Sequence, residues 1–202
     1  MSRVALFGGT FDPIHNGHIN LAKTAVKECS LDELIFVPNY ISPFKQGSSV
    51  TPGTKRAEMI QEILPLDGAF RLSSYELERS KPSYTYDTLC HFRNQMKTTE
   101  VSFIIGFDSV LTIDKWYHGE DILREFPLIT GVRPHVATDE GFRRIVAYRE
   151  KYGSRIHVLN LNPFDASSTE IRRRIRSRES VDGLIAPEVE AYIERNKLYR
   201  VE

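Results

Sequence analysis

Residues 8–18, GGTFDPIHNGH, decide how this chain folds. The apolar residues 4–7 before them, Val-Ala-Leu-Phe, are typical of a buried strand. After them, apolar side chains recur with the spacing of one helix face, at positions 19, 22, 25, 26 and 29. The pattern predicts a strand, a glycine turn and a helix in direct succession.

This turn has the chemistry of a phosphate site. Glycines let backbone N–H groups approach a ligand, and a helix N-terminus carries about half a positive charge. His15 and His18 stand three positions apart, so they face the same way beside that terminus. Zinc is the alternative ligand for a histidine pair, but no Cys, Asp or Glu follows at ligand spacing. The stretch is neither the dinucleotide fingerprint nor the P-loop. Amide donors, a helix dipole and two imidazoles suit a phosphate that gains negative charge during reaction.

The composition indicates one domain with a proper core. The chain has 202 residues, and 27 Lys and Arg balance 27 Asp and Glu, which argues against nucleic acid or an anionic membrane as a partner. No apolar run approaches membrane-spanning length, and the N-terminus lacks the shape of a signal peptide. Cys29 and Cys90 have no metal or redox spacing, so we expect a reduced, cytoplasmic protein. A disulfide between them and the oligomeric state stay open.

Strand and helix patterns alternate to the end of the chain. Strand patterns occupy residues 4–7, 34–38, 70–73, 101–105, 126–130 and 156–159. The later helix patterns occupy residues 55–64, 85–96, 121–125, 139–152, 168–178 and 187–195. This alternation predicts an α/β fold with a single doubly wound, mostly parallel sheet of about six strands. Ligands bind beyond the carboxyl ends of such strands, which is where the residues with unusual chemistry fall.

A second phosphate-binding pattern spans residues 167–176, SSTEIRRRIR. Ser167 and Glu170 fit a capping box, which predicts the start of a helix. Hydroxyls and N–H groups at that start can bind phosphate oxygens, and Arg172 lies about one turn in. An ordinary capped helix with a solvated basic face is the alternative, and a nucleic-acid patch is weakened by the zero net charge. Beside the first motif, phosphate binding is favoured.

Several stretches together resemble one known family. Residues 8–18 resemble the H-x-G-H signature of the nucleotidyltransferase superfamily, in the form typical of bacterial nicotinate-mononucleotide adenylyltransferases. SSTEIR at 167–172 resembles the second signature of that superfamily. ELERSKPSYTYDTL at 76–89 resembles the SYT-x-DTL segment of the nicotinate branch, and Trp116 after IIGFDS matches it too. The resemblance covers nearly the whole chain.

The resemblance implies an enzyme that transfers AMP from ATP to nicotinate mononucleotide. The products would be nicotinate adenine dinucleotide and pyrophosphate, in NAD biosynthesis. The fold would be a single Rossmann-like nucleotidyltransferase domain over residues 1–202, with the triphosphate-binding helix and the closing helices at 167–202. The mononucleotide phosphate would attack the α-phosphorus directly, and Mg²⁺ would enter with ATP rather than in a protein cage.

The same resemblance implies roles for individual residues. Catalysis would fall to His15, His18 and Arg172. ATP would be bound by Gly8, Gly9, Thr10, Phe11, His18, Gly106, Asp108, Arg133, Ser167, Ser168, Thr169 and Arg172. Nicotinate mononucleotide would be bound by Lys45, Tyr84, Thr85, Trp116 and Tyr117. Within that set Trp116 would stack on the pyridine ring, and Thr85 would help to hold the nicotinate carboxylate.

Taken alone, some of these residues have ordinary structural interpretations. Asp108 suits a helix N-cap as well as a ribose contact, and Trp116 suits a core or a subunit interface. Phe107 departs from the family, which usually has Ala there, so we expect a bulky ring beside the nucleotide that alters the pocket. The loop around Lys45, residues 39–53, also departs from the family and is the expected lid.

Two other functions stay open at this point. A sibling adenylyltransferase would act on nicotinamide mononucleotide or on phosphopantetheine, although the pantetheine enzymes lack the SYT-x-DTL and Trp pairing. A non-catalytic nucleotide-binding regulator would keep the fold without turnover, but both histidines and Arg172 are present. Release of pyrophosphate would identify an enzyme, whereas ATP binding without release would fit a regulator.

Overall fold

The computed structural model describes residues 2–40, 50–79, 81–96, 100–132, 138–161, 164 and 166–200. Within them, six strands form one sheet in the order β3-β2-β1-β4-β5-β6, and every pairing is parallel. The strands are β1 (Arg3–Gly9), β2 (Glu33–Pro38), β3 (Phe70–Leu72), β4 (Glu100–Gly106), β5 (Leu128–Gly131) and β6 (Ile156–Leu159). The predicted α/β class and single doubly wound sheet are confirmed.

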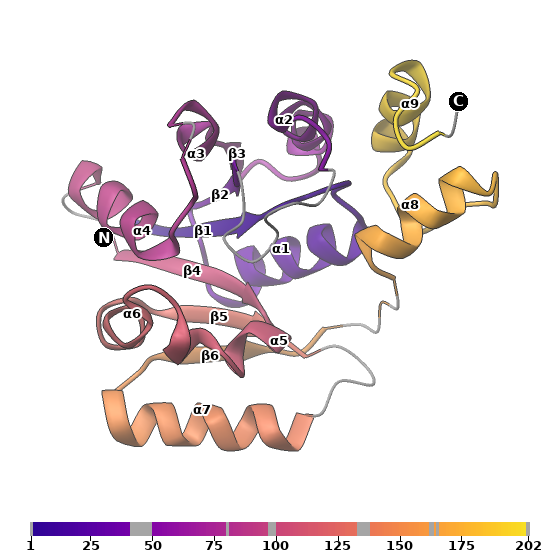
Figure 1. Ribbon diagram of the computed structural model, residues 1–202. Helices are drawn as coiled ribbons and strands as arrows, with labels where there is room; N and C mark the ends of the chain where they lie inside the picture. The colour runs from indigo at the N-terminus through magenta and orange to yellow at the C-terminus, as the bar shows by residue number, and fades with distance from the viewer. Residues whose placement is uncertain are drawn as a thin grey trace.

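Helices cover both faces of this sheet (Figure 1). They are α1 (Asn16–Glu28), α2 (Gly53–Gln61), α3 (Tyr75–Glu78), α4 (Thr85–Gln95), α5 (Phe107–Val110), α6 (Gly119–Glu125), α7 (Thr138–Tyr152), α8 (Ser168–Arg176) and α9 (Pro187–Arg195), with 3₁₀ turns η1 (Leu64–Leu66) and η2 (Ile113–Lys115). In Figure 1 the strands run through the middle of the molecule, α7 lies below them, and α8 and α9 lie to the right.

The alternation of side chains along β1 explains the two layers. Ala5 and Phe7 join the apolar core under α1, α2, α8 and α9, whereas Val4 and Leu6 join the core under α4 to α7. All four side chains are at most 4% exposed. Burial of a side chain such as Leu6 or Phe7 contributes about 1.5–3 kcal/mol, more than an exposed ion pair does, so the two cores hold the sheet in place.

A few element boundaries differ from the sequence prediction. The strand expected from residue 126 begins at Leu128, because Phe126 is the C-cap of α6 and Pro127 has no N–H for a ladder. The last-but-one helix ends at Arg176 rather than 178, since Arg178 adopts a left-handed φ of +56°. The four-residue helices α3 and α5 are too short to show a helical period and were not predicted.

The winding of the sheet reverses at β1, which pairs with β2 on one side and with β4 on the other. Gly9, Pro38 and Gly106 end these three strands at the same edge, and Gly9 pairs directly with Pro38. This is where a doubly wound sheet binds ligands.

Among the described helices, none has the length and apolar character needed to cross a bilayer, and the cytoplasmic location stays a prediction.

Candidate active site

The two glycines that end β1 are packed so closely that they leave little room for a side chain. A Cβ on Gly8 would lie 3.1 Å from the Phe103 ring, and one on Gly9 would lie 2.8 Å from the Phe11 ring. Phe11 has a left-handed φ of +50° and is buried, with its ring edge-on to that of Phe7. The Phe11 side chain therefore belongs to the core and supports the turn.

His15 and His18 lie face to face at the start of α1. Their ring centroids are 3.7 Å apart and their planes differ by 25°, which confirms that the two imidazoles face the same way. The backbone N–H of His15, the N-cap residue, donates to Nδ1 of His18 at 3.3 Å. Because Nδ1 accepts this bond, a neutral His18 ring carries its proton on Nε2 and donates from there.

The first turn of α8 packs directly against the glycine turn. Ser168 Oγ donates to the Pro13 carbonyl oxygen at 3.0 Å, and Arg172 Nη1 donates to the Asp12 carbonyl oxygen at 2.6 Å. These bonds join residues that are 155 and 160 positions apart in the sequence. The start of α8 thus lies against the segment that leads into α1, so amide donors and a guanidinium lie near the start of both helices.

The start of α8 forms half of the predicted capping box. Ser167 Oγ accepts a hydrogen bond from the Glu170 backbone N–H at 3.2 Å, as expected. The Glu170 carboxylate does not complete the box and instead pairs with Arg173 and Arg174 at 2.8 and 2.9 Å. These bonds, first to Arg173 and then to Arg174, lower the pKa of Glu170 to about 2. The basic face is therefore partly neutralised, while Arg172 is directed to the turn.

A pocket of about 220 Å³ lies beyond the carboxyl ends of β1, β2 and β4. It brings together five residues of the predicted site: Gly8, Gly9, Thr10, Thr85 and Trp116. The other lining residues are Leu6, Val37, Asn39, Glu76, Ser83, Thr88, Phe103 and Ser109. Both predicted substrate regions, the glycine turn and the SYT-x-DTL segment with Trp116, therefore share one pocket.

Aromatic rings continue from this pocket toward the surface. Tyr84, the N-cap residue of α4, and Tyr117 are 38% and 52% exposed, with ring centroids 4.7 Å apart. The next residue, His118, stacks on Tyr86 at 4.6 Å and pairs with Asp121 at 2.7 Å. The stacking on Tyr86 depends on how α4 and α6 pack, whereas Asp121 lies only three positions away in the sequence.

Glu76, in α3, is a buried carboxylate in the pocket wall to which sequence reasoning gave no role. Thr88 Oγ1 donates to Glu76 Oε1 at 2.7 Å. Burial raises the pKa of Glu76, while hydrogen bonds from Thr88 and Ser83 act in the opposite direction. Glu76 is the first residue of the stretch ELERSKPSYTYDTL, which the sequence analysis singled out. The sequence alone does not show that its carboxylate bonds to Thr88, which lies 12 positions away.

The segment after β4 corrects two expectations. Phe107 does not line the pocket, because its ring is 1% exposed and packs against Gly141 and Phe142 of α7. Asp108 is not the N-cap of α5, since Gly106 holds that position and Asp108 lies in the exposed first turn. Its ribose contact stays a prediction.

Some predicted residues are not tested by this geometry. Lys45 and Arg133 lie outside the described residues.

Cys29 and Cys90 are both free, so the disulfide that the sequence left open is not formed. No group of three His, Cys, Asp or Glu side chains that could hold a metal ion occurs in the part of the chain that the structure describes.

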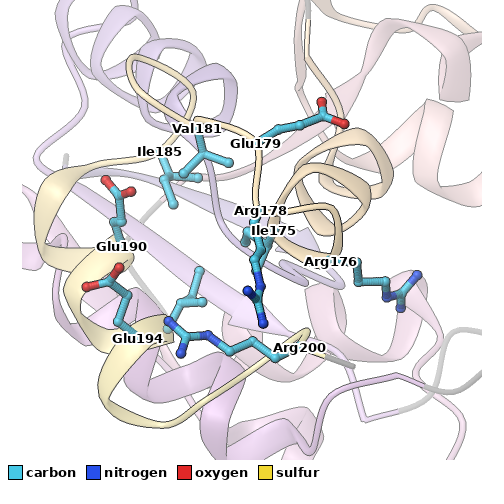
Figure 2. Close-up of a pocket in the computed structure, with 10 residues that line it drawn as sticks. Ile175, Arg176, Arg178, Glu179, Val181, Ile185, Glu190, Glu194 and Arg200 are labelled. Carbon is cyan, nitrogen blue, oxygen red and sulfur yellow. The ribbon is translucent and has the colours of Figure 1, made fainter. Parts of the chain in front are cut away.

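A second hollow, of about 380 Å³, lies between α8 and α9 and shares no lining residue with the first (Figure 2). Arg178 and Arg200 face it together with Glu190 and Glu194, over apolar side chains such as Ile185. Burial raises the pKa of Glu190, as do Asp182 and Glu194. None of the predicted site residues reaches this hollow, which is separate from the contact between the start of α8 and the segment that leads into α1.

Comparisons with known proteins agree with this geometry. Residues 6–174 match the cytidylyltransferase-like family. The chain is 37% identical to a probable nicotinate-nucleotide adenylyltransferase of Clostridium acetobutylicum, over 98% of this chain and 100% of the relative. It is 34% identical to the nicotinate-nucleotide adenylyltransferase of Bacillus subtilis, over 98% and 99%. A Plasmodium falciparum nicotinic acid mononucleotide adenylyltransferase, solved with NaAD, has the same fold with a TM-score of 0.81, 22% identity and 98% coverage of both chains.

Proposed function

The chain belongs to the cytidylyltransferase-like family, and within it to the nicotinate-nucleotide adenylyltransferases, and we propose on this premise that it transfers AMP from ATP to nicotinate mononucleotide. A phosphate oxygen of the mononucleotide attacks the α-phosphorus of ATP. The bond from that phosphorus to the bridging β-phosphate oxygen breaks, and pyrophosphate leaves. The other product is nicotinate adenine dinucleotide.

One observation carries the proposal. The start of α8 is joined to Asp12 and Pro13, in the segment that leads into α1, by hydrogen bonds from Arg172 and Ser168. The glycine turn just before Asp12 also lines the pocket that contains Trp116. A triphosphate at the two helix starts would therefore have its α-phosphorus next to an acceptor held in the pocket.

The chain acts by positioning and by stabilising charge. His18, donating from Nε2, and the Gly8 to Thr10 amides face the charge that develops on the α-phosphate, and His15 holds the His18 ring by stacking. Ser168, Thr169 and Arg172 hold the departing pyrophosphate. Mg²⁺ would enter with ATP rather than in a protein cage, and it would neutralise part of the triphosphate charge.

The pocket wall selects the acceptor. Trp116 offers an indole face to the pyridinium ring, which gains from stacking and from cation–π attraction. Thr85 lies at the first position of α4, where backbone N–H groups and the helix dipole favour a carboxylate. This combination favours the acid over the amide.

Pyrophosphate release with Mg-ATP tests the proposal, with nicotinate mononucleotide, nicotinamide mononucleotide and phosphopantetheine compared side by side. We expect a strong preference for the acid. Activity with phosphopantetheine alone would keep the phosphate chemistry and overturn the acceptor. Binding of ATP without release of pyrophosphate with any acceptor would instead identify a regulator.

A further inference from the structure

Arg56 is a fully buried cation whose hydrogen bonds go to backbone carbonyl oxygens. It is 1% exposed, on the inner side of α2. Nη1 donates to the carbonyl oxygen of Thr10 at 2.6 Å, Nη2 to that of Asn39 at 2.6 Å, and Nε to that of Thr51 at 2.9 Å. Ion pairing does not account for the burial of Arg56, because these hydrogen-bond acceptors are neutral carbonyl oxygens.

The three carbonyls belong to three different segments, which Arg56 joins. Thr10 follows β1, Asn39 follows β2, and Thr51 precedes α2. Thr10 and Asn39 both line the pocket, and the Asn39 amide also donates to Thr10 Oγ1 at 3.3 Å. One planar guanidinium therefore bridges the residues that follow two neighbouring strands.

Only arginine can make this set of bonds. Its five N–H donors lie in one rigid plane, so three carbonyls in different directions can be served at once. A lysine ammonium is a point donor on a flexible stem and cannot span the same positions. Burial lowers the pKa of Arg56, and the nearby Asp12 carboxylate opposes this effect. A cation placed this deeply carries a desolvation cost that a purely apolar side chain would avoid.

We propose that Arg56 is a positioning residue for catalysis, which fixes the Thr10 and Asn39 backbones in the geometry that the triphosphate and the acceptor require. The proposal rests on the function proposed above. It adds a residue of α2 that lines no part of the pocket and acts through the backbone of two residues that do.

Arg56→Lys and Arg56→Ala test it, with Ile60→Ala as the matched control. Ile60 is fully buried one turn further along α2 and is absent from the pocket lining, so its truncation lowers stability without touching the strand ends. Each variant is assayed below its own Tm for kcat and KM, and for ATP affinity by calorimetry, which needs no turnover.

We expect Arg56→Lys to lower kcat/KM on the order of 100-fold, as misplacement of reacting groups by about 1 Å does. ATP affinity should fall as well, and ethylguanidinium added to Arg56→Ala should restore part of both. If that variant does not fold, the lysine variant alone decides the question. The proposal would be overturned if Arg56→Lys kept the kinetics and ATP affinity of the wild type. It would also be overturned if the losses of kcat/KM and ATP affinity in Arg56→Lys were no larger than those in Ile60→Ala. Failure of the proposed function is separate, because it would appear as ATP binding by the wild type without pyrophosphate release.

Discussion

The Tyr199 hydroxyl donates a 2.6 Å hydrogen bond to Oδ1 of Asp12, across 187 positions of sequence. Asp12 is 5% exposed, and its other oxygen accepts from the Thr51 backbone N–H at 3.3 Å. The end of the chain is therefore tied into the turn that carries the two histidines. We expect Tyr199→Phe to lower the free energy of unfolding by about 1–3 kcal/mol, because it removes a donor from a buried carboxylate. Urea unfolding measures this, and an unchanged midpoint would refute the structural role.

The same bond predicts a pH dependence of stability. Burial, together with Asp12, raises the pKa of Tyr199 well above its usual range. An ordinary Tyr ionises near about pH 10, so the stabilisation is fully present below that pH and is lost as the pH rises toward the folded-state pKa. We expect the stability difference between wild type and Tyr199→Phe to shrink as the pH rises from about 10 to about 11. A difference that stays constant over this range would contradict the assignment.

His18→Ala should reduce turnover rather than binding. A donor aimed at charge that develops in the transition state is worth about 3–4 kcal/mol, so kcat should fall roughly a hundred- to thousand-fold with little change in either KM. His157→Ala is the control, since His157 is an exposed β6 residue that faces Glu28 at 3.9 Å. Steady-state kinetics of both variants decide the point. Equal effects of the two substitutions would remove His18 from the mechanism.

Trp116→Ala should act mainly on the acceptor. Loss of a stacking platform costs about 1–3 kcal/mol, which is expected as a rise in KM for nicotinate mononucleotide. The KM for ATP and kcat should change little. The acceptor KM of Trp116→Phe should lie between those of the wild type and Trp116→Ala. A variant that loses kcat while its acceptor KM stays at the wild-type value would show that Trp116 does not hold the pyridine ring.

Glu76→Gln should change how stability varies with pH. The raised pKa of Glu76 means that folding opposes its ionisation, so stability decreases as the pH rises from about 4 through the folded-state pKa. The amide still accepts from Thr88 Oγ1 and does not titrate. We therefore expect the Tm of the variant minus that of wild type to increase as the pH rises from acidic to neutral, as measured by parallel thermal melts. Parallel curves would mean that Glu76 ionises as it would in water.

The fold and the core of the site were predictable because their signals are local. Apolar periodicity marks each strand and most helices within a few residues, and residues 8–18 contain the turn, the helix start and both histidines together. The pairing of this turn with the start of α8 followed from the resemblance, and the bonds from Arg172 and Ser168 place the two motifs in contact.

What local sequence could not determine is which distant groups meet. Arg56, Glu76 and Tyr199 read as ordinary helix or tail residues, since most of their partners lie 12 to 187 positions away. Phe107 was expected in the pocket and is buried instead, because α7 presents Gly141 to its ring. The amino-acid sequence by itself determined the strands, the helices and the phosphate-binding motifs. Only the tertiary structure decided how buried polar groups hold the site, because a hydrogen bond depends on the approach of two atoms rather than on their separation along the chain.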